Sequence, residues 1–153
     1  IHILNKKNVK IKILVSGKIK EKVYYNKIKE YKKWISNSSL FKIDIIFLKD
    51  NNLKKLSQNQ IFHISKRNFS LCLTENGNQI SSVDFSDLIT SKNEELLFII
   101  GPPDGLDKEV IKKCNYNLSL SSFTLPHELA FLLLMEQIFR AISINNGSKY
   151  HRV

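Results

Sequence analysis

The fold is decided by residues Asn117–Val153, which read NLSLSSFTLPHELAFLLLMEQIFRAISINNGSKYHRV. The segment begins as a short polar strand, passes Pro126, continues as a helix to about Ile144 and ends in a polar tail. The helix has no polar side chain from Leu129 to Met135, and a helix that is apolar all round is buried on every side. Two arrangements bury it: a central place in the core, or one face on a sheet and the other on a two-fold-related second copy.

Upstream of this segment, apolar runs alternate with amphipathic ones. This alternation predicts an α/β fold with a mainly parallel sheet flanked by helices. Ligands of such sheets bind beyond the carboxyl ends of the strands, here after Ser16, Leu73, Ile100 and Ser121. Residues 50–68 carry only weak helical marks, and residues 74–78 are predicted to form a turn. The predicted strands are Val9–Ser16, Leu40–Leu48, Phe69–Leu73, Leu96–Ile100 and Asn117–Ser121, and the helices before the last are Lys18–Ser36, Ser81–Thr90 and Asp107–Lys113.

Length and charge set broad limits on function. A chain of 153 residues fits one domain. Its formal net charge of +10 favours a polyanionic partner, with nucleic acid ahead of an anionic membrane. The alternative is a codon bias, because 21 of the 24 basic residues are Lys and only 3 are Arg. The two cysteines and dispersed histidines give no metal spacing, and no run reaches the length of a membrane span.

Two loops have the composition of a nucleoside site. Gly101 and Gly105 let the main chain approach a ligand closely. The second loop mixes hydroxyl side chains with apolar ones, which suits an adenine-like group held by main-chain hydrogen bonds. Taken alone, the same residues also fit ordinary turns. The second loop comprises Leu120, Ser121, Ser122, Phe123, Thr124, Leu125 and Pro126.

The order of four motifs resembles one family. They are IIGPPDGL (99–106), LSLSSFTLPHELA (118–130), MEQIFRAISI (135–144) and the terminal YHR (150–152). Together they resemble the RlmH family of the SPOUT, or α/β-knot, methyltransferases. The resemblance runs over residues 9–153, which it marks as a single SPOUT methyltransferase domain, and leaves residues 1–8 as an N-terminal extension.

The resemblance implies a fold, a cofactor and a substrate. The family's members are homodimers with a C-terminal trefoil knot, a rare exception to the rule that chains do not thread. They transfer a methyl group from S-adenosylmethionine to N3 of a pseudouridine in large-subunit ribosomal RNA, and S-adenosylhomocysteine is the product. Carried over by motif, the cofactor contacts are Leu73, Gly101, Pro102, Gly105 and residues 120–126, and the active-site tail is Tyr150, His151 and Arg152.

Several of these residues have two interpretations. His151 is either the base that takes the N3 proton or a group that positions phosphate or ribose. Arg152 either binds an RNA phosphate or is an exposed terminal side chain. Tyr150 either stacks on the base or packs the tail. His127 and Arg140 either contact RNA or act structurally, Arg140 through an ion pair with a carboxylate four residues earlier.

The chain also departs from the family pattern. Pro102 stands where the family has a second glycine and removes one backbone donor, which favours an alternative function as an RNA-binding module with an impaired cofactor site. Phe131 or a neighbour stands where the family has a basic residue. Residues 50–68 are shorter than the family's and lack its clear helix. The expected compartment is the cytoplasm of a bacterium, or an organelle matrix after removal of a targeting segment.

Overall fold

The sheet has five strands in the order β2-β1-β4-β3-β5, and every neighbouring pair is parallel. The computed structural model describes residues 8–152, so the predicted N-terminal extension lies almost wholly outside the described residues. This topology confirms the predicted α/β class with a mainly parallel sheet. The strands are β1 (Val9–Ser16), β2 (Phe41–Leu48), β3 (Asn68–Asn78), β4 (Glu95–Ile100) and β5 (Tyr116–Leu118).

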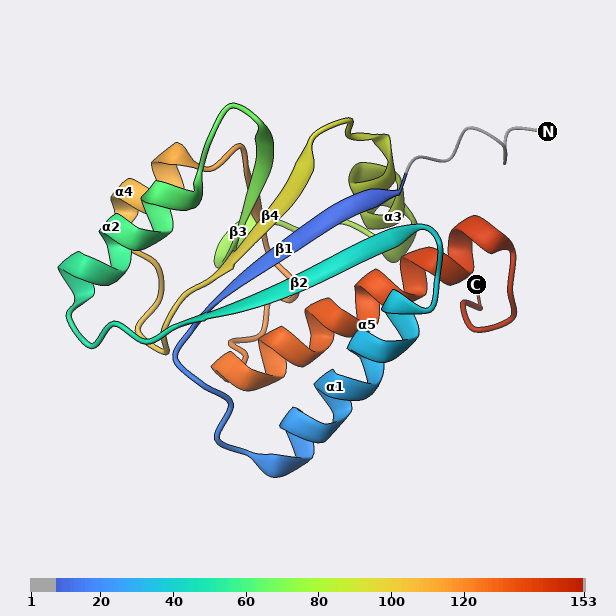
Figure 1. Cartoon of the computed structure of the whole chain (residues 1–153), viewed down its shortest axis with the longest axis horizontal. Helices are drawn as coiled ribbons and strands as arrows, with labels where there is room; N and C mark the ends of the chain where they lie inside the picture. The colour runs from blue at the N-terminus through green and yellow to red at the C-terminus, as the bar shows by residue number, and fades with distance from the viewer. Residues whose placement is uncertain (1–7, 153) are drawn as a thin grey trace.

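Helices cover both faces of the sheet (Figure 1). Three of them, α1, α3 and α5, pack on one face, and α2 and α4 pack on the other. The long α5 contacts both α1 and α3, so it is the middle helix of its layer. The helices are α1 (Lys22–Ser36), α2 (Leu53–His63), α3 (Ser82–Ser91), α4 (Lys108–Lys113) and α5 (His127–Asn146).

The position of the central strand β4, between two layers of helices, explains why its sequence is apolar without a break. Phe98 and Ile100 face the α1–α3–α5 layer, whereas Leu97 and Ile99 face α2 and α4. Side chains alternate along a strand, so a parallel strand covered on both faces needs apolar residues at every position. Each such fully buried side chain contributes about 1.5–3 kcal/mol.

Two predictions about local structure were wrong. Residues 53–63 form α2, because Asn52 caps the helix by accepting from the backbone N–H of Lys54 at 2.9 Å. Residues 74–78 are not a simple turn: β3 continues to Asn78, and Leu118 of β5 pairs with both Leu73 and Asn78. Residues 74–77 therefore bulge from the strand at the carboxyl edge of the sheet.

A close approach between chain segments holds this bulge. A Cβ atom on Gly77 would lie 2.8 Å from the backbone of Asn117, which no side chain tolerates. The backbone N–H of Ser119 then donates to the Asn78 carbonyl oxygen at 3.0 Å. Strand β5 ends at Leu118, earlier than predicted. The trefoil knot itself stays a prediction.

No helix within residues 8–152 is long and apolar enough to cross a bilayer. The same residues hold no group of three His, Cys, Asp or Glu side chains placed to bind a metal ion.

Candidate active site

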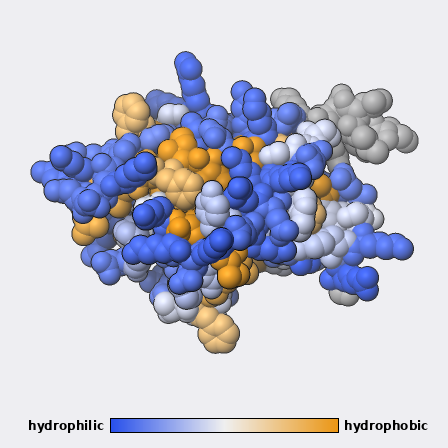
Figure 2. Space-filling view, turned by 60° about the horizontal axis from the view of Figure 1, so that its bottom comes forward, coloured by the Kyte–Doolittle hydropathy of each residue, from blue (hydrophilic) through white to orange (hydrophobic). Residues whose placement is uncertain are grey.

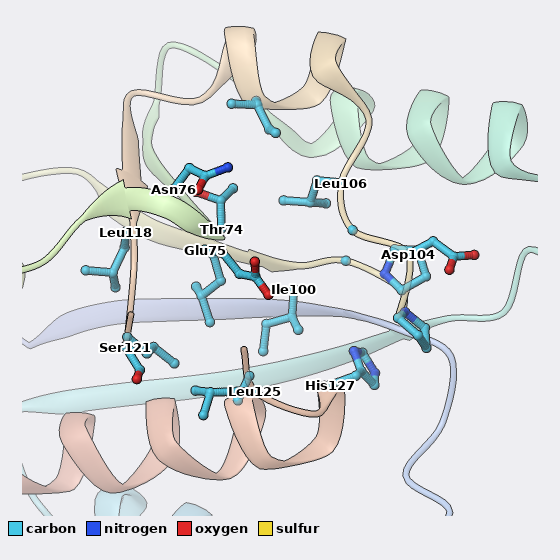
Figure 3. Close-up of a pocket in the computed structure, with 18 of the residues that line it drawn as sticks. Thr74, Glu75, Asn76, Ile100, Asp104, Leu106, Leu118, Ser121, Leu125 and His127 are labelled. Atoms are coloured by element: carbon cyan, nitrogen blue, oxygen red, sulfur yellow. The ribbon is translucent and has the colours of Figure 1, made fainter. Parts of the chain in front are cut away.

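A cavity of about 410 Å³ opens at the carboxyl edge of the sheet (Figure 3). Its walls come from the β3 bulge, the loop after β4, the loop after β5 and the start of α5. This volume lies in the range of small-molecule sites. Of the residues predicted to contact a cofactor, those that line the cavity are Leu73, Gly101, Pro102, Gly105, Leu120, Ser121, Phe123 and Leu125.

Three of the predicted cofactor residues lie elsewhere. Pro126 lines a neighbouring cavity, described below. Ser122 and Thr124 are exposed and line neither cavity. Of the hydroxyl side chains in the loop after β5, Ser121 therefore lies at the cavity, and its Oγ accepts from the Phe123 backbone N–H at 2.9 Å.

The loop after β4 presents its main chain to the cavity. Gly105 adopts φ +91° and donates its N–H to the Pro102 carbonyl oxygen at 2.8 Å, which closes a tight turn. A Cβ atom on Gly101 would lie 2.8 Å from Leu106 Cγ, so only glycine leaves this wall of the cavity undisturbed. Pro102 carries no N–H, so the donors of this loop come from its other residues.

Polar side chains that the sequence interpretation missed also line the cavity. Thr74, Glu75 and Asn76 come from the β3 bulge, and Asp104 comes from the loop after β4 (Figure 3). The bulge places them there, and it depends on pairing with β5, some forty residues later. No local signal distinguishes it from a turn, although Gly77 marks the close approach.

A buried polar chain fixes the end of β4 at this edge. Gln60 of α2 donates to Ser16 Oγ at 3.1 Å, and the Ser16 hydroxyl donates to the Ile100 carbonyl oxygen at 3.0 Å. Gln60 and Ser16 are both buried. Because buried polar groups need partners, this chain ties α2, β1 and β4 together immediately before Gly101.

A second cavity of about 910 Å³ adjoins the first and shares Pro102, Pro103 and His127 with it. The loop after β1 forms its other wall. The Glu128 carboxylate holds that loop by accepting from the backbone N–H groups of Lys20 and Glu21 at 2.9 and 3.0 Å. Nδ1 of His127 is buried with no hydrogen-bond partner within residues 8–152.

The C-terminal tail folds back along α5. Gly147 ends the helix in the left-handed conformation, with φ +66°, and the chain reverses there. The backbone N–H of Ser148 then donates to the Ser143 carbonyl oxygen, and that of His151 donates to Ser143 Oγ, each at 3.0 Å. Tyr150 packs edge-on against Phe139, with ring centroids 4.9 Å apart.

Glu136 is the centre of the tail's polar contacts. Its Oε2 accepts from Arg140 Nη2 and from the Tyr150 hydroxyl, each at 2.7 Å. The ion pair predicted between Glu136 and Arg140 is thus confirmed. Burial raises the pKa of the Glu136 carboxyl, but hydrogen bonds from Arg140 and Tyr150 outweigh it, so the pKa lies below its ordinary 4.5. Burial, then the Tyr31 and Glu136 hydrogen bonds, raises the pKa of Tyr150 above its ordinary 10.0.

Within one chain, the tail and the cofactor-sized cavity are apart. Tyr150, His151, Arg152 and Arg140 line neither cavity. The tail docks at positions 136–143 of α5, whereas the cavity meets the helix at positions 127 and 130. At 1.5 Å per residue, this is a separation of roughly 9–24 Å along the helix.

The outer side of α5 is apolar near the cavities. Leu129, Leu132 and Leu133 are only half-buried, and their spacing places them on one stripe of the helix. Figure 2, turned so that the side carrying α1 and α5 comes forward, shows apolar side chains gathered near the middle of this face. The inner side is fully buried, as at Phe131, Leu134 and Ile138.

Comparison with known proteins identifies the family. The family model described as "Predicted SPOUT methyltransferase" matches residues 9–151. The chain is 39% identical to "Ribosomal RNA large subunit methyltransferase H" of Prochlorococcus marinus strain MIT 9515, over 94% of this chain and 96% of that protein. It is 35% identical to the protein of the same name from Caldicellulosiruptor saccharolyticus, over 93% and 99%.

A solved structure agrees at the level of the fold. The "probable methylase family protein" from Haemophilus influenzae Rd KW20 aligns over 96% of this chain and 71% of that one, with a TM-score of 0.55 and 13% identity. The family model covers nearly all of the described chain, and relatives above 30% identity align almost end to end with it. The chain therefore belongs to the SPOUT methyltransferase family.

Proposed function

We propose that this protein methylates large-subunit ribosomal RNA, at N3 of a pseudouridine, with S-adenosylmethionine as the methyl donor. The observation that carries the proposal is the 410 Å³ cavity, whose walls combine one loop that contains two glycines, Gly101 and Gly105, with apolar side chains at the carboxyl edge of a parallel sheet. The relatives named above as ribosomal RNA methyltransferases support the choice of substrate. The net charge of +10 suits a polyanion.

The residues present fit the methyl donor. The apolar side chains of Leu73, Ile100 and Leu120 suit an adenine ring, and the main chain around Gly101 and Gly105 can approach it closely. Glu75 and Asp104 line the same cavity, and the Glu75 carboxylate suits a hydroxyl or ammonium group of the donor. We assign the cofactor contacts to the predicted residues that line this cavity.

The chain's part in methyl transfer is positioning. When bound, the donor would supply a methyl group on a positively charged sulfur: the acceptor nitrogen, after loss of its proton to solvent, would form the new bond to the methyl carbon with its own electron pair, and the electrons of the broken carbon–sulfur bond would stay with the sulfur. Holding donor and acceptor in line is worth about 7–11 kcal/mol in favourable cases. The Gln60–Ser16–Ile100 hydrogen-bond chain, which holds the end of β4 beside the cavity, supports such an alignment.

We further propose that the active unit is a homodimer in which the tail of one chain completes the cavity of the other. Two observations support this: the tail docks roughly 9–24 Å along α5 from its own cavity, and α5 carries the half-buried leucine stripe Leu129, Leu132 and Leu133. In that arrangement Arg152, exposed at the end of the tail, binds RNA phosphate. His127, between the two cavities, lies beside the incoming nucleotide.

One observation favours a second function. Pro102 removes a backbone donor from the wall of the cavity, as expected of an RNA-binding module with an impaired cofactor site. Calorimetry with S-adenosylmethionine separates the two functions. A heat of binding that fits one site per chain supports the methyltransferase function. The absence of heat at millimolar ligand supports the RNA-binding module.

The activity is tested with ribosomes that lack the modification. Purified protein, S-adenosylmethionine carrying a labelled methyl group and large subunits from a strain without its own enzyme should yield about one labelled methyl per large subunit. Mass spectrometry of the digested RNA then identifies the nucleoside. Label in another nucleoside, or none despite cofactor binding, would overturn the proposed substrate. We place the protein where its ribosomes are, in a bacterial cytoplasm or an organelle matrix.

A further inference from the structure

The tail contains a contact that fixes the protonation of one histidine. Arg140 Nη1 lies 3.1 Å from His151 Nδ1. A guanidinium nitrogen has hydrogens to donate and no lone pair to offer, so Nδ1 must be the acceptor. A histidine that accepts at Nδ1 is neutral and carries its proton on Nε2.

Arg140 is itself held in this orientation. Its Nε and Nη2 atoms donate to Glu136 Oε1 and Oε2, at 3.3 and 2.7 Å, as a two-pronged ion pair. This fork leaves Nη1 to face His151. The Tyr150 ring covers the guanidinium, with its centroid 5.0 Å from Cζ, and the Tyr150 hydroxyl donates to Glu136 Oε2. The guanidinium therefore has little freedom to turn away.

The backbone of His151 is held as well as its ring. Its N–H donates to Ser143 Oγ, which also accepts from the Ser148 hydroxyl at 2.7 Å. The imidazole is thus fixed through its main chain and through Nδ1, and the protonated Nε2 lies on the other side of the ring.

We propose that Glu136 and Arg140 are positioning residues that hold His151 as its neutral Nε2–H tautomer, so that His151 donates a hydrogen bond to the RNA substrate and does not serve as the base. The catalytic consequence rests on the proposed function. The acceptor N3 lies between two ring carbonyl groups, and negative charge grows on their oxygens as the N3 proton leaves. A fixed N–H donor at one of these oxygens stabilises that charge.

The tautomer is tested on the full-length protein by nitrogen NMR of ¹⁵N-labelled histidine at neutral pH. The His151→Gln spectrum identifies the His151 signals among those of the four histidines. We expect a neutral ring with a hydrogen-bonded acceptor at Nδ1 and the proton on Nε2. Arg140→Met should remove the hydrogen-bond shift at Nδ1, and Arg140→Lys, which keeps a donor, should restore it in part. An imidazolium, or a proton on Nδ1, would overturn the proposal.

The role is tested by methyl transfer with two matched substitutions. The amide of His151→Gln can donate near the position of Nε2 and cannot act as a base, whereas His151→Leu can do neither. Loss of one such donor costs about 100-fold or more, so we expect that loss in the leucine variant and a loss within about 10-fold in the glutamine variant. Equal, near-complete losses would sink the donor role. A wild type without activity but with the expected NMR signals would instead count against the proposed function.

Discussion

At Gly101, the effect of side-chain size on the cavity can be tested without adding a polar or charged group. It lies at the wall of the smaller cavity, and any Cβ atom there meets Leu106 Cγ at 2.8 Å. The two nearest atoms belong to the Leu106 side chain and the third is the backbone carbonyl carbon of Gly105 at 3.1 Å, so the fold accommodates a methyl group mainly by moving Leu106. That movement changes the shape of the cavity, because Leu106 also lines it.

We therefore predict that Gly101→Ala weakens S-adenosylmethionine binding about 10-fold, or 1.4 kcal/mol, with little change in thermal stability. Calorimetry measures the affinity, and a thermal melt measures the stability. Ser122→Ala is the matched control, because Ser122 is exposed and lines neither cavity. Unchanged affinity in Gly101→Ala, or a loss as large in Ser122→Ala, would show that the cofactor binds elsewhere.

Glu136 makes tail docking depend on pH. The folded-state pKa of its carboxyl is below the ordinary 4.5, so its stabilising contacts are fully present above that pH and are lost as the pH falls through the folded value. The pKa of Tyr150 is raised above its ordinary 10.0, so its contribution is present below pH 10 and is lost on further titration with base. Docking should be constant between these limits.

The only tryptophan reports the acid transition. Trp34 lies 5.4 Å from Phe139 in ring centroids, and Phe139 packs on Tyr150. We predict that, as the pH falls below the ordinary 4.5 of a glutamate, Trp34 fluorescence changes before the far-ultraviolet circular dichroism does, because the tail leaves α5. Glu136→Gln has no carboxyl to titrate and should lack this transition. The same transition in Glu136→Gln would assign it to another acid.

At the scale of elements, the sequence correctly predicted the strands whose bounds follow from the local pattern of apolar residues. The runs in β1, β2 and β4 are uninterrupted or strongly alternating, and their predicted bounds fall within about a residue of the observed ones. The β3 bulge was missed because it is set by pairing with β5, which no local pattern reveals. Most of the predicted cavity residues lie on loops recognised by motif, whereas three of the missed polar residues, Thr74, Glu75 and Asn76, lie on that bulge.

Helix α2 was missed because its amphipathic pattern is weak. Within it Leu56 and Gln60 are buried, so the helix depends on few core contacts and on its cap. The Asn52 side chain accepts from the backbone N–H groups of Lys54 and Lys55 at 2.9 and 3.3 Å. The signal was present in the sequence as an asparagine immediately before the first leucine of the helix.

We predict that Asn52→Ala lowers the free energy of unfolding by about 0.5–2 kcal/mol, the usual cost of losing such a cap. Urea denaturation measures it. Asn51→Ala, at the adjacent exposed position, is the control and should stay within about 0.5 kcal/mol of the wild type. Equal effects of the two substitutions would mean that the cap does not stabilise α2.

At the scale of the molecule, the two sides of α5 have different roles. Its inner side fills the core through Phe131, Leu134 and Ile138, and its outer side carries the half-buried leucine stripe. We predict that the wild type sediments as a dimer and that Leu133→Asp shifts it to a monomer with near-native circular dichroism, because a charge at a dimer interface lacks a partner. Analytical ultracentrifugation decides this. A monomeric wild type would contradict the proposed homodimer and, with it, the proposed site shared between two chains.

The shared site makes a quantitative prediction for mixed dimers. One variant ends at Lys149 and so has a sound cavity and no tail; the other carries Gly101→Leu and has a tail and a blocked cavity. If tail and cavity come from different chains, a mixed dimer contains one complete site. Random pairing of equal amounts makes about half of the dimers mixed, so about a quarter of wild-type sites should be restored, although neither variant is active alone. If each chain used its own tail, the mixture would be as inactive as its parts. Methyl transfer measured after co-refolding of the two variants distinguishes about a quarter of the wild-type activity from none. Leu133→Asp in both variants should abolish the restored activity.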